Sequence, residues 1–176
     1  SAFVQRGGVA PLAVITETGW DDPALRQLAS TATAVAVVPP ALMADISTLE
    51  SPAPLGFVIP WAGPGQLKMG EPSVVLDRLQ DAGNVGSILR SAAAFGFEQV
   101  IALEGTAALW SPKVMRAGMG AHFSLNLVEG VEADALAELG VALLATSPHA
   151  SVPIDRAELP WPCGWVPIVS TTLPVR

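Results

Sequence analysis

The chain has 176 residues, of which 51% are hydrophobic and 14% are charged, and its formal net charge is −7. This composition excludes a disordered chain, and the acidic balance argues against indiscriminate nucleic-acid binding, which usually depends on a basic surface. No apolar run reaches the ~18 residues that a membrane span needs. Cys163 is the single cysteine and has no partner for an internal disulfide, which fits a cytoplasmic protein. We expect a globular protein without a membrane segment, built as one medium domain or two small ones.

Strands and helices alternate in the first third of the chain. The expected elements are a strand, a helix, a strand, a helix and a strand, at residues 10–16, 23–29, 34–38, 40–46 and 55–59. Alternation of this kind predicts parallel strands joined by helical crossovers. The acidic residues and Arg26 occupy positions typical of solvated helix faces, so we expect this part to have a structural role and no chemistry of its own.

A segment rich in proline and glycine separates this part from the rest. Residues 61–72 (WAGPGQLKMGEP) contain no periodic apolar pattern. Segments of this composition form loops and linkers. We therefore divide the chain into residues 1–60, a linker at 61–72 and a second α/β domain at 73–176.

The second domain begins with the most informative stretch of the sequence. An apolar strand at residues 74–76 ends at the charged pair Asp77 and Arg78. A loop follows and then a helix, for which the side chain of Asn84 is a suitable N-cap. This strand and helix predict a βα unit whose loop lies at the carboxyl end of the strand, where open α/β sheets place their ligands.

Arg90 lies one helical turn after Gly86 in this unit. Because helical side chains lean toward the N-terminus, the guanidinium of Arg90 can reach over Gly86 toward Asn84 and the loop. A cation, an amide and the free N–H groups of a helix start then converge on one place, which favours an anionic ligand. The alternative is an ordinary βα unit with a polar loop, which is a common structure.

The pattern of alternating elements continues to the end of the second domain. We expect a strand, a helix, a strand, an amphipathic helix, a buried strand and a last strand, at residues 99–103, from 111, 123–128, 132–139, 141–146 and 164–166. Lys113 and Arg116 share one side of the helix that Ser111 begins. They are either two solvated cations or, together with Arg78 and Arg90, part of a cluster that faces phosphate.

The stretch from Asp77 to Gly96 resembles the first signature of a known enzyme family. The residues that fit its pattern, D-x-x-x-D-x-x-N-V-G-S-I-x-R-x-A-x-x-F-G, are Asp77, Asp81, Asn84, Val85, Gly86, Ser87, Ile88, Arg90, Ala92, Phe95 and Gly96. This signature is typical of the SpoU-type (TrmH-like) RNA 2′-O-ribose methyltransferases of the SPOUT superfamily. The segment SPKVMRAGMGA resembles the next family stretch, Lys-x-x-Arg-Ala-Ser-x-Gly-Ala, with Gly118 in place of the serine.

The resemblance implies an α/β fold of the SPOUT type, in which helices flank a parallel sheet and the C-terminal part forms a trefoil knot. It implies that residues 1–60 are part of a small ribosomal-protein-like domain that binds the RNA substrate. The implied reaction transfers a methyl group from S-adenosyl-L-methionine to a ribose 2′-hydroxyl of rRNA or tRNA. Homodimers dominate in the family, so we expect a homodimer. No cluster of Cys, His and acidic residues has metal-ligand spacing, so we expect no metal.

The resemblance also implies which residues carry the reaction. Asn84 would position the target ribose or order the loop, and Arg90 would lie against the 2′-hydroxyl and its flanking phosphate. A guanidinium has a pKa above ~12 and stays charged. We therefore expect Arg90 to orient the ribose–phosphate and stabilise the developing oxyanion, and not to act as a base.

Two further sets of residues follow from the same resemblance. The backbone after the strand at 141–146 is expected to touch the adenosine part of the cofactor, at Ala145, Thr146 and Ser147. Residues expected to contact RNA are Arg78, Lys113 and Arg116. His149 follows the same strand, but it has no carboxylate or metal partner nearby in sequence and gives little support for a general base. His122 is expected to be a packing or surface residue.

The sequence departs from the family after residue 159. Residues 159–176 contain neither the family's Gly-x-Glu-x-x-Gly loop nor its Ile-Pro strand nor its Ser-Leu-Asn-Val segment, which thread the knot and form most of the cofactor pocket and the dimer face. We therefore expect a methyltransferase domain that is incomplete at its C-terminus, and a catalytically inactive RNA-binding protein of the same fold stays as an alternative. A nucleotide-binding module ranks last, because neither G-x-G-x-x-G nor G-x-x-x-x-G-K-[ST] is present.

Overall fold

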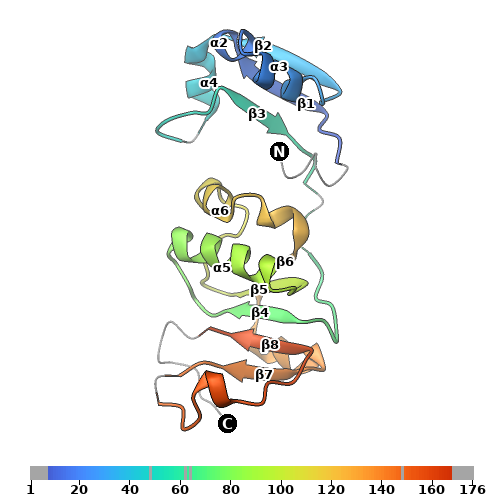
Figure 1. The fold of residues 1–176 in the computed structure, drawn as a ribbon, viewed down its shortest axis with the longest axis vertical. Coiled ribbons are helices and arrows are strands. Elements are labelled where there is room, and N and C mark those ends of the chain that lie inside the picture. Colours follow the sequence, from blue (N-terminus) through green and yellow to red (C-terminus); the bar gives the residue numbers. More distant parts are fainter. Residues whose placement is uncertain (1–7, 48, 62, 64, 148, 168–176) are drawn as a thin grey trace. The chain divides into compact units, whose positions relative to one another are not determined.

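A computed structural model of the chain describes residues 8–47, 49–61, 63, 65–147 and 149–167. The chain divides into two compact units, Ser1–Gly63 and Pro64–Arg176. Figure 1 shows the elements of each unit. None of the helices in the described ranges is both long and apolar enough to cross a membrane.

The N-terminal unit is a three-stranded sheet with helices. Its strands are β1 (Leu12–Thr16), β2 (Ala34–Val38) and β3 (Leu55–Val58), in the order β2-β1-β3. Its helices are α2 (Glu17–Trp20), α3 (Pro23–Ala29) and α4 (Pro40–Ile46). The carboxylate of Asp22 caps α3 by accepting from the backbone N–H groups of Ala24 and Leu25.

The expectation of only parallel strands is wrong for β3. Strands β1 and β2 are parallel, but β1 and β3 are antiparallel. The seven-residue helix α4 is ~10 Å long and does not return the chain to the amino end of the sheet. The chain stays at the carboxyl end of β1 instead, where the N–H of Thr16 donates to the carbonyl of Pro54 at 2.8 Å.

The C-terminal unit is a five-stranded sheet in which every recorded pairing is parallel. Its strands, in the order β6-β5-β4-β8-β7, are β4 (Ser73–Leu76), β5 (Gln99–Leu103), β6 (Asn126–Val131), β7 (Ala142–Ala145) and β8 (Cys163–Val166). Strands β5 and β6 follow β4 outward on one side, and the chain then crosses to the other side of β4 for β7 and β8. The carboxyl ends of all five strands lie at one edge of the sheet, which we call the carboxyl edge.

Helices cover both faces of this sheet. The helices are α5 (Ala82–Ala94) and α6 (Pro112–Gly118), with the 3₁₀ segments η1 (Ala121–Ser124), η2 (Ala133–Leu139) and η3 (Ile154–Arg156). Helices α5 and α6 pack on one face in a core that includes Leu76, Leu89 and Val114, and Figure 1 shows them side by side above β4 and β5. Segment η2 covers the opposite face through Leu136 and Leu139.

Three expectations for this unit need correction. The strand expected at 123–128 begins only at Asn126, because residues 121–124 form the turn η1 after Gly120, whose φ is 90°. The helix expected at 132–139 is the 3₁₀ segment η2, and Leu136 and Leu139 are buried as predicted. The strand expected to be buried at 141–146 is β7, which is mostly exposed because it forms an edge of the sheet.

The amino ends of β4, β5 and β6 carry a ladder of three polar side chains, Ser73, Gln99 and Asn126. The amide nitrogen of Gln99 donates to the Ser73 hydroxyl at 2.8 Å and to the Lys68 carbonyl at 2.7 Å. Its amide oxygen accepts from the N–H of Lys68 and from the side chain of Asn126. Asn126 also donates to the carbonyl of Gln66 at 2.7 Å. This polar ladder fixes the segment that leads into β4.

Candidate functional site

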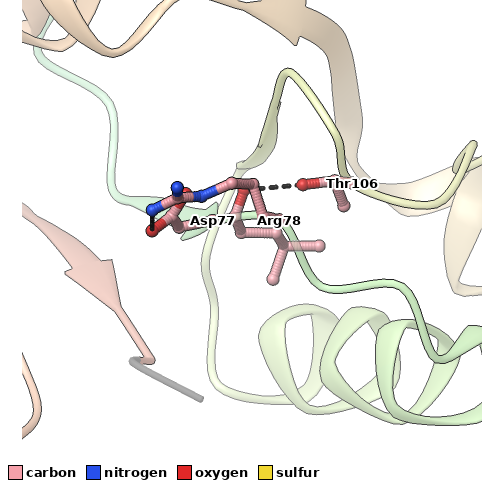
Figure 2. Close-up of polar contacts among 4 residues, drawn as sticks. Asp77, Arg78 and Thr106 are labelled. Carbon is pink, nitrogen blue, oxygen red and sulfur yellow. Dashed lines mark hydrogen bonds and ion pairs between the residues drawn. The ribbon is translucent and has the colours of Figure 1, made fainter. Parts of the chain in front are cut away.

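The carboxyl edge of the sheet carries an ion pair directly after β4. The Nε of Arg78 donates to Oδ1 of Asp77 at 2.9 Å, and Nη2 donates to Oδ2 at 3.0 Å (Figure 2). The Asp77 side chain is 8% exposed and the Arg78 side chain 51% exposed. The hydrogen bond and the charge of Asp77 raise the pKa of Arg78 above its usual value. A nearly buried carboxylate therefore holds a guanidinium that faces solvent.

The backbone around Arg78 is held by the loop that follows β5. Arg78 has a φ of 50°, in the left-handed region that a long side chain rarely adopts. Oγ1 of Thr106 donates to the Leu76 carbonyl at 3.0 Å, and the N–H of Ala107 donates to the Leu79 carbonyl at 2.9 Å. Gly105 leaves room for the Arg78 stem, because a Cβ there would lie 3.1 Å from Cγ of Arg78. Bonds on both sides thus fix the turn that presents Arg78.

Asp81, and not Asn84, caps helix α5, so that part of the prediction is wrong. Oδ1 of Asp81 accepts from the backbone N–H of Asn84 at 2.7 Å, and the helix begins at Ala82. Asp81 precedes the first turn in extended backbone, which is the geometry that an N-cap needs. Asn84 therefore lies inside the first turn, with an exposed side chain.

Arg90 is exposed on the stripe of α5 that faces α6. One turn earlier, Gly86 is buried against α6 so closely that a Cβ on Gly86 would overlap the backbone and side chain of Ala117. Within the part of the chain that the structure describes, no hydrogen bond or ion pair of the Arg90 side chain is recorded. Its guanidinium is therefore available to a ligand.

Lys113 and Arg116 are both exposed on α6, three residues apart. Helix α6 follows the β5 loop from the same carboxyl edge and packs against α5. Ser111 is the N-cap residue, as predicted, and Pro112 is the first helical residue, although the Ser111 hydroxyl makes no capping hydrogen bond. The elements that carry the four cations thus all start at one edge of the sheet, while a direct ion pair is recorded only for Arg78 among the described residues.

His122 is a packing residue, as expected. Its ring is buried, and Nε2 lies 2.8 Å from the carbonyl of Leu109. Burial lowers the pKa of His122, and the hydrogen bond to Leu109 and the charge of Glu129 oppose this shift without reversing it. The ring fills the space beside Gly118, where a Cβ would lie 2.5 Å from Cε1 of His122.

A cavity of about 420 Å³ lies at the carboxyl end of β7. Ala145, Thr146 and Ser147 all line it, so the structure brings the three residues of the expected cofactor segment together at one cavity. The N–H of Thr146 donates to the Val166 carbonyl, and the hydroxyl of Ser147 accepts from the N–H of His149. The His149 side chain is exposed and does not line the cavity.

Sequence reasoning missed Leu159 and Trp165 in this cavity. Both residues also line a second, apolar cavity of about 570 Å³ beside α5 and β4. No local pattern identifies them, because they reach the cavity only through the pairing of β8 between β4 and β7. The carboxyl edge therefore combines a cavity lined by small and apolar side chains with exposed cations. This arrangement can bind an uncharged ring system beside an anionic chain. In the described ranges no group of three His, Cys, Asp or Glu side chains has the geometry of a metal site.

Known sequences are similar to the C-terminal unit. The model of the SpoU rRNA Methylase family matches residues 71–169, which is more than half of the chain. Mitochondrial rRNA methyltransferase 3 of Mus musculus is 42% identical over 89 residues, which cover 45% of this chain and 21% of that protein. The 23S rRNA (guanosine(2553)-2′-O)-methyltransferase RlmP of Bacillus subtilis is 30% identical over 88 residues, which cover 46% of this chain and 36% of that protein. The matched part is thus well under half of either relative.

Solved structures share the fold. The crystal structure of an RNA 2′-O ribose methyltransferase has a TM-score of 0.74 and 28% identity, covering 94% of this chain and 66% of that chain. The SpoU methyltransferase AviRb of Streptomyces viridochromogenes, crystallised with the cofactor AdoMet, has a TM-score of 0.73 and 21% identity, covering 94% and 67%. At 21% identity this second likeness shows the fold alone. The family model spans all five parallel strands together with the residues at their carboxyl edge, and the chain therefore belongs to the SpoU rRNA methylase family.

Proposed function

We propose that the C-terminal unit of this chain transfers a methyl group from S-adenosyl-L-methionine to a ribose 2′-hydroxyl of rRNA or tRNA. One observation carries the proposal: within the segment that matches the family, a ligand-sized cavity lies at the edge of the parallel sheet from which helix α5, with the exposed Arg90, also begins. Open α/β sheets bind their ligands at this edge, where the strand order changes direction. The names of the relatives and the AdoMet-bound neighbour support the choice of reaction and cofactor.

The cavity at β7 fits the cofactor. A volume of about 420 Å³ is within the range of small-molecule pockets, and the lining is mostly small and apolar. Ala145, Thr146 and Ser147 would hold the adenosine part, and the side chain of Trp165 would cover its ring. When bound, the cofactor supplies a methyl group on a sulfonium centre.

Arg90 and Asn84 would act on the target ribose. The exposed guanidinium of Arg90 is permanently charged, so it orients the ribose–phosphate and stabilises negative charge on the 2′-oxygen as its proton leaves. The exposed amide of Asn84, in the first turn of α5, donates and accepts hydrogen bonds and holds the ribose in position. In-line transfer needs such positioning more than it needs a strong base.

Arg78, Lys113 and Arg116 would bind the RNA backbone, because Lys and Arg supply most contacts to phosphate. A local group of cations on a chain of net charge −7 favours binding at one place over binding along the whole surface. The N-terminal unit would itself bind RNA as a substrate domain. We further propose a homodimer, a trefoil knot and a cytoplasmic location, as expected for the family. Light scattering after size exclusion tests the dimer.

The test of the function is a pair of measurements on the full chain. Calorimetric titration with S-adenosyl-L-methionine is expected to give micromolar binding, and the labelled methyl group is expected to appear on ribose 2′-oxygens of added ribosomal RNA. A folded chain that binds RNA but neither binds the cofactor nor transfers methyl groups would contradict the proposal. That outcome would instead support an inactive RNA-binding protein of the same fold.

A further inference from the structure

Asp77 and Arg78 differ from an ordinary surface ion pair. In most exposed pairs both side chains are solvated and the pair adds little. Here the carboxylate of Asp77 is 8% exposed while the guanidinium of Arg78 is 51% exposed. We propose that Asp77 is a positioning residue, which fixes the guanidinium of Arg78 so that its free edge binds one phosphate of the RNA. This inference rests on the proposed function, because it assumes an RNA ligand.

The donors of Arg78 divide between two edges of the guanidinium. Nε and one N–H of Nη2 point to the two oxygens of Asp77, at 2.9 and 3.0 Å. A guanidinium has five N–H donors in a planar fork, so the N–H groups of Nη1 and the second N–H of Nη2 are left on the outer edge. This outer edge matches two phosphate oxygens, the geometry for which arginine is preferred over lysine.

The surroundings hold both partners at this place. The left-handed backbone at Arg78, with a φ of 50°, is kept by the Thr106 bond to Leu76 and by the tight fit of Gly105 against the Arg78 stem. Figure 2 shows the guanidinium directed to Asp77 and the Thr106 hydroxyl to the strand end. An unusual backbone conformation persists only where the structure around it over-determines it.

Removing the charge of Asp77 should change the affinity for RNA, and the direction of this change can be measured. If Asp77 acted only through its negative charge, its removal would strengthen RNA binding. If Asp77 acts by orienting Arg78, its removal frees the guanidinium to rotate, and RNA binding weakens although the protein has become less negative. The two explanations therefore predict opposite changes in affinity.

The experiment measures binding of the full chain to a fluorescein-labelled single-stranded 20-nucleotide RNA of mixed sequence, by anisotropy at several salt concentrations. Arg78→Gln is expected to weaken binding about tenfold. It should also reduce the salt slope by ~0.7, which corresponds to one phosphate contact on a single strand. Arg78→Lys should keep the salt slope, because it keeps the charge. It should still bind RNA about threefold more weakly, because it loses the planar fork of donors. Asp77→Asn should weaken binding about threefold.

Two control variants show whether Asp77→Asn acts by releasing Arg78 or only by removing a negative charge, and melting temperatures show whether the variants are folded. Asp134→Asn removes an exposed carboxylate on η2 and should leave the affinity the same or slightly tighter. In the Arg78→Gln background, Asp77→Asn should cause no further loss, because the residue that it positions is already absent. The melting temperature of each variant is measured, and Arg78→Lys and Asp77→Asn are expected to remain folded.

The outcomes distinguish the two proposals. A wild-type chain without affinity for RNA overturns the proposed function and this inference together. The inference alone is overturned if the wild type binds RNA and Asp77→Asn tightens that binding. It is also overturned if Asp77→Asn weakens RNA binding equally in the wild-type protein and in the Arg78→Gln variant. If Arg78→Gln leaves RNA binding unchanged but weakens binding of S-adenosyl-L-methionine, the free edge serves the carboxylate of the cofactor, and the inference is also overturned.

Discussion

The two edges of the five-stranded sheet use polar residues in opposite ways. At the amino edge, Ser73, Gln99 and Asn126 form a ladder whose members bond one another and the segment before β4, and Gln99 is fully buried. At the carboxyl edge, where α5 begins, the Asn84 side chain is exposed. Arg90, further along the same helix, is also exposed, and its side chain makes no hydrogen bond or ion pair with the described residues.

This difference separates polar groups that hold the fold from polar groups that are open to a ligand. A buried amide is costly unless its hydrogen bonds are made, so a fully bonded one stabilises a unique structure and has no donor left. An exposed cation adds little to stability and keeps its donors. The polar ladder should therefore affect stability when changed, and the carboxyl edge should affect activity.

The largest expected effect is the loss of methyl transfer in Arg90→Ala. Removing a group that stabilises charge in the transition state typically lowers kcat about 10²- to 10³-fold. The melting temperature and the affinity for S-adenosyl-L-methionine should stay close to wild type, because Arg90 is exposed and lies outside the cavity at β7. Single-turnover assays on ribosomal RNA measure the rate, and Arg90→Lys serves as the matched variant that keeps the charge. Full turnover by Arg90→Ala would show that Arg90 takes no part in the reaction.

The opposite pattern is expected for Gln99→Ala at the amino edge. The substitution removes the buried partner of the Ser73 hydroxyl and the partly buried partner of both backbone groups of Lys68, and it leaves a cavity, which together should lower the free energy of unfolding by about 3 kcal/mol. Urea unfolding measures the loss. Binding of S-adenosyl-L-methionine to the folded variant should be unchanged. Glu98→Ala, at an exposed neighbour, should cost less than about 0.5 kcal/mol. Equal costs for the two variants would contradict a structural role for the ladder.

The pair of Gly118 and His122 tests whether a buried polar residue outside the amino edge also has a structural role. Gly118→Ser should destabilise the protein by about 2 kcal/mol, because the new Cβ meets the buried ring of His122. His122→Ala removes that ring, so the double variant should be more stable than the sum of the two single losses predicts. Thermal unfolding of the three variants completes the cycle. Simple addition of the two losses would show that the ring and Gly118 are not in contact.

The smallest expected effect is a pH dependence of stability from His122. Burial lowers the pKa of His122 in the folded state, whereas the unfolded chain has the usual value near ~6.5. As the pH falls through ~6.5, the unfolded chain binds a proton that the folded chain does not, so the free energy of unfolding falls until the pH reaches the lowered pKa. The slope should not exceed ~1.4 kcal/mol per pH unit.

Urea titrations between pH 7.5 and 5.5, for example, measure this slope. His122→Gln should flatten it, and His149→Gln, at an exposed position, is the control. A slope that survives in His122→Gln would have to come from other groups.

Much of this protein could be predicted from local patterns. The expected bounds of β2, α3, α4 and β5 agree with the observed ones, because each element depends on residues that are neighbours in sequence. These are the apolar runs of the two strands, the Asp22 cap of α3 and Pro40 at the start of α4. The signature from Asp77 to Gly96 predicted the family. The cap at Asp81 was missed because Asp81 and Asn84 are both suitable cap residues, and only the backbone geometry distinguishes them.

The sequence by itself determined most of the strands and helices and the family of the C-terminal unit. Only the tertiary structure decided that β8 pairs between β4 and β7, which brings Trp165 to the cavity of Ala145, Thr146 and Ser147. It also decided that the Asp77 side chain is nearly buried while the Arg78 side chain is exposed. The same holds for Gln99, whose amide makes all its hydrogen bonds inside the protein, and for Arg90, which is exposed. The physical reason is that burial and hydrogen-bond partners come from residues far apart in the chain, which no local pattern records.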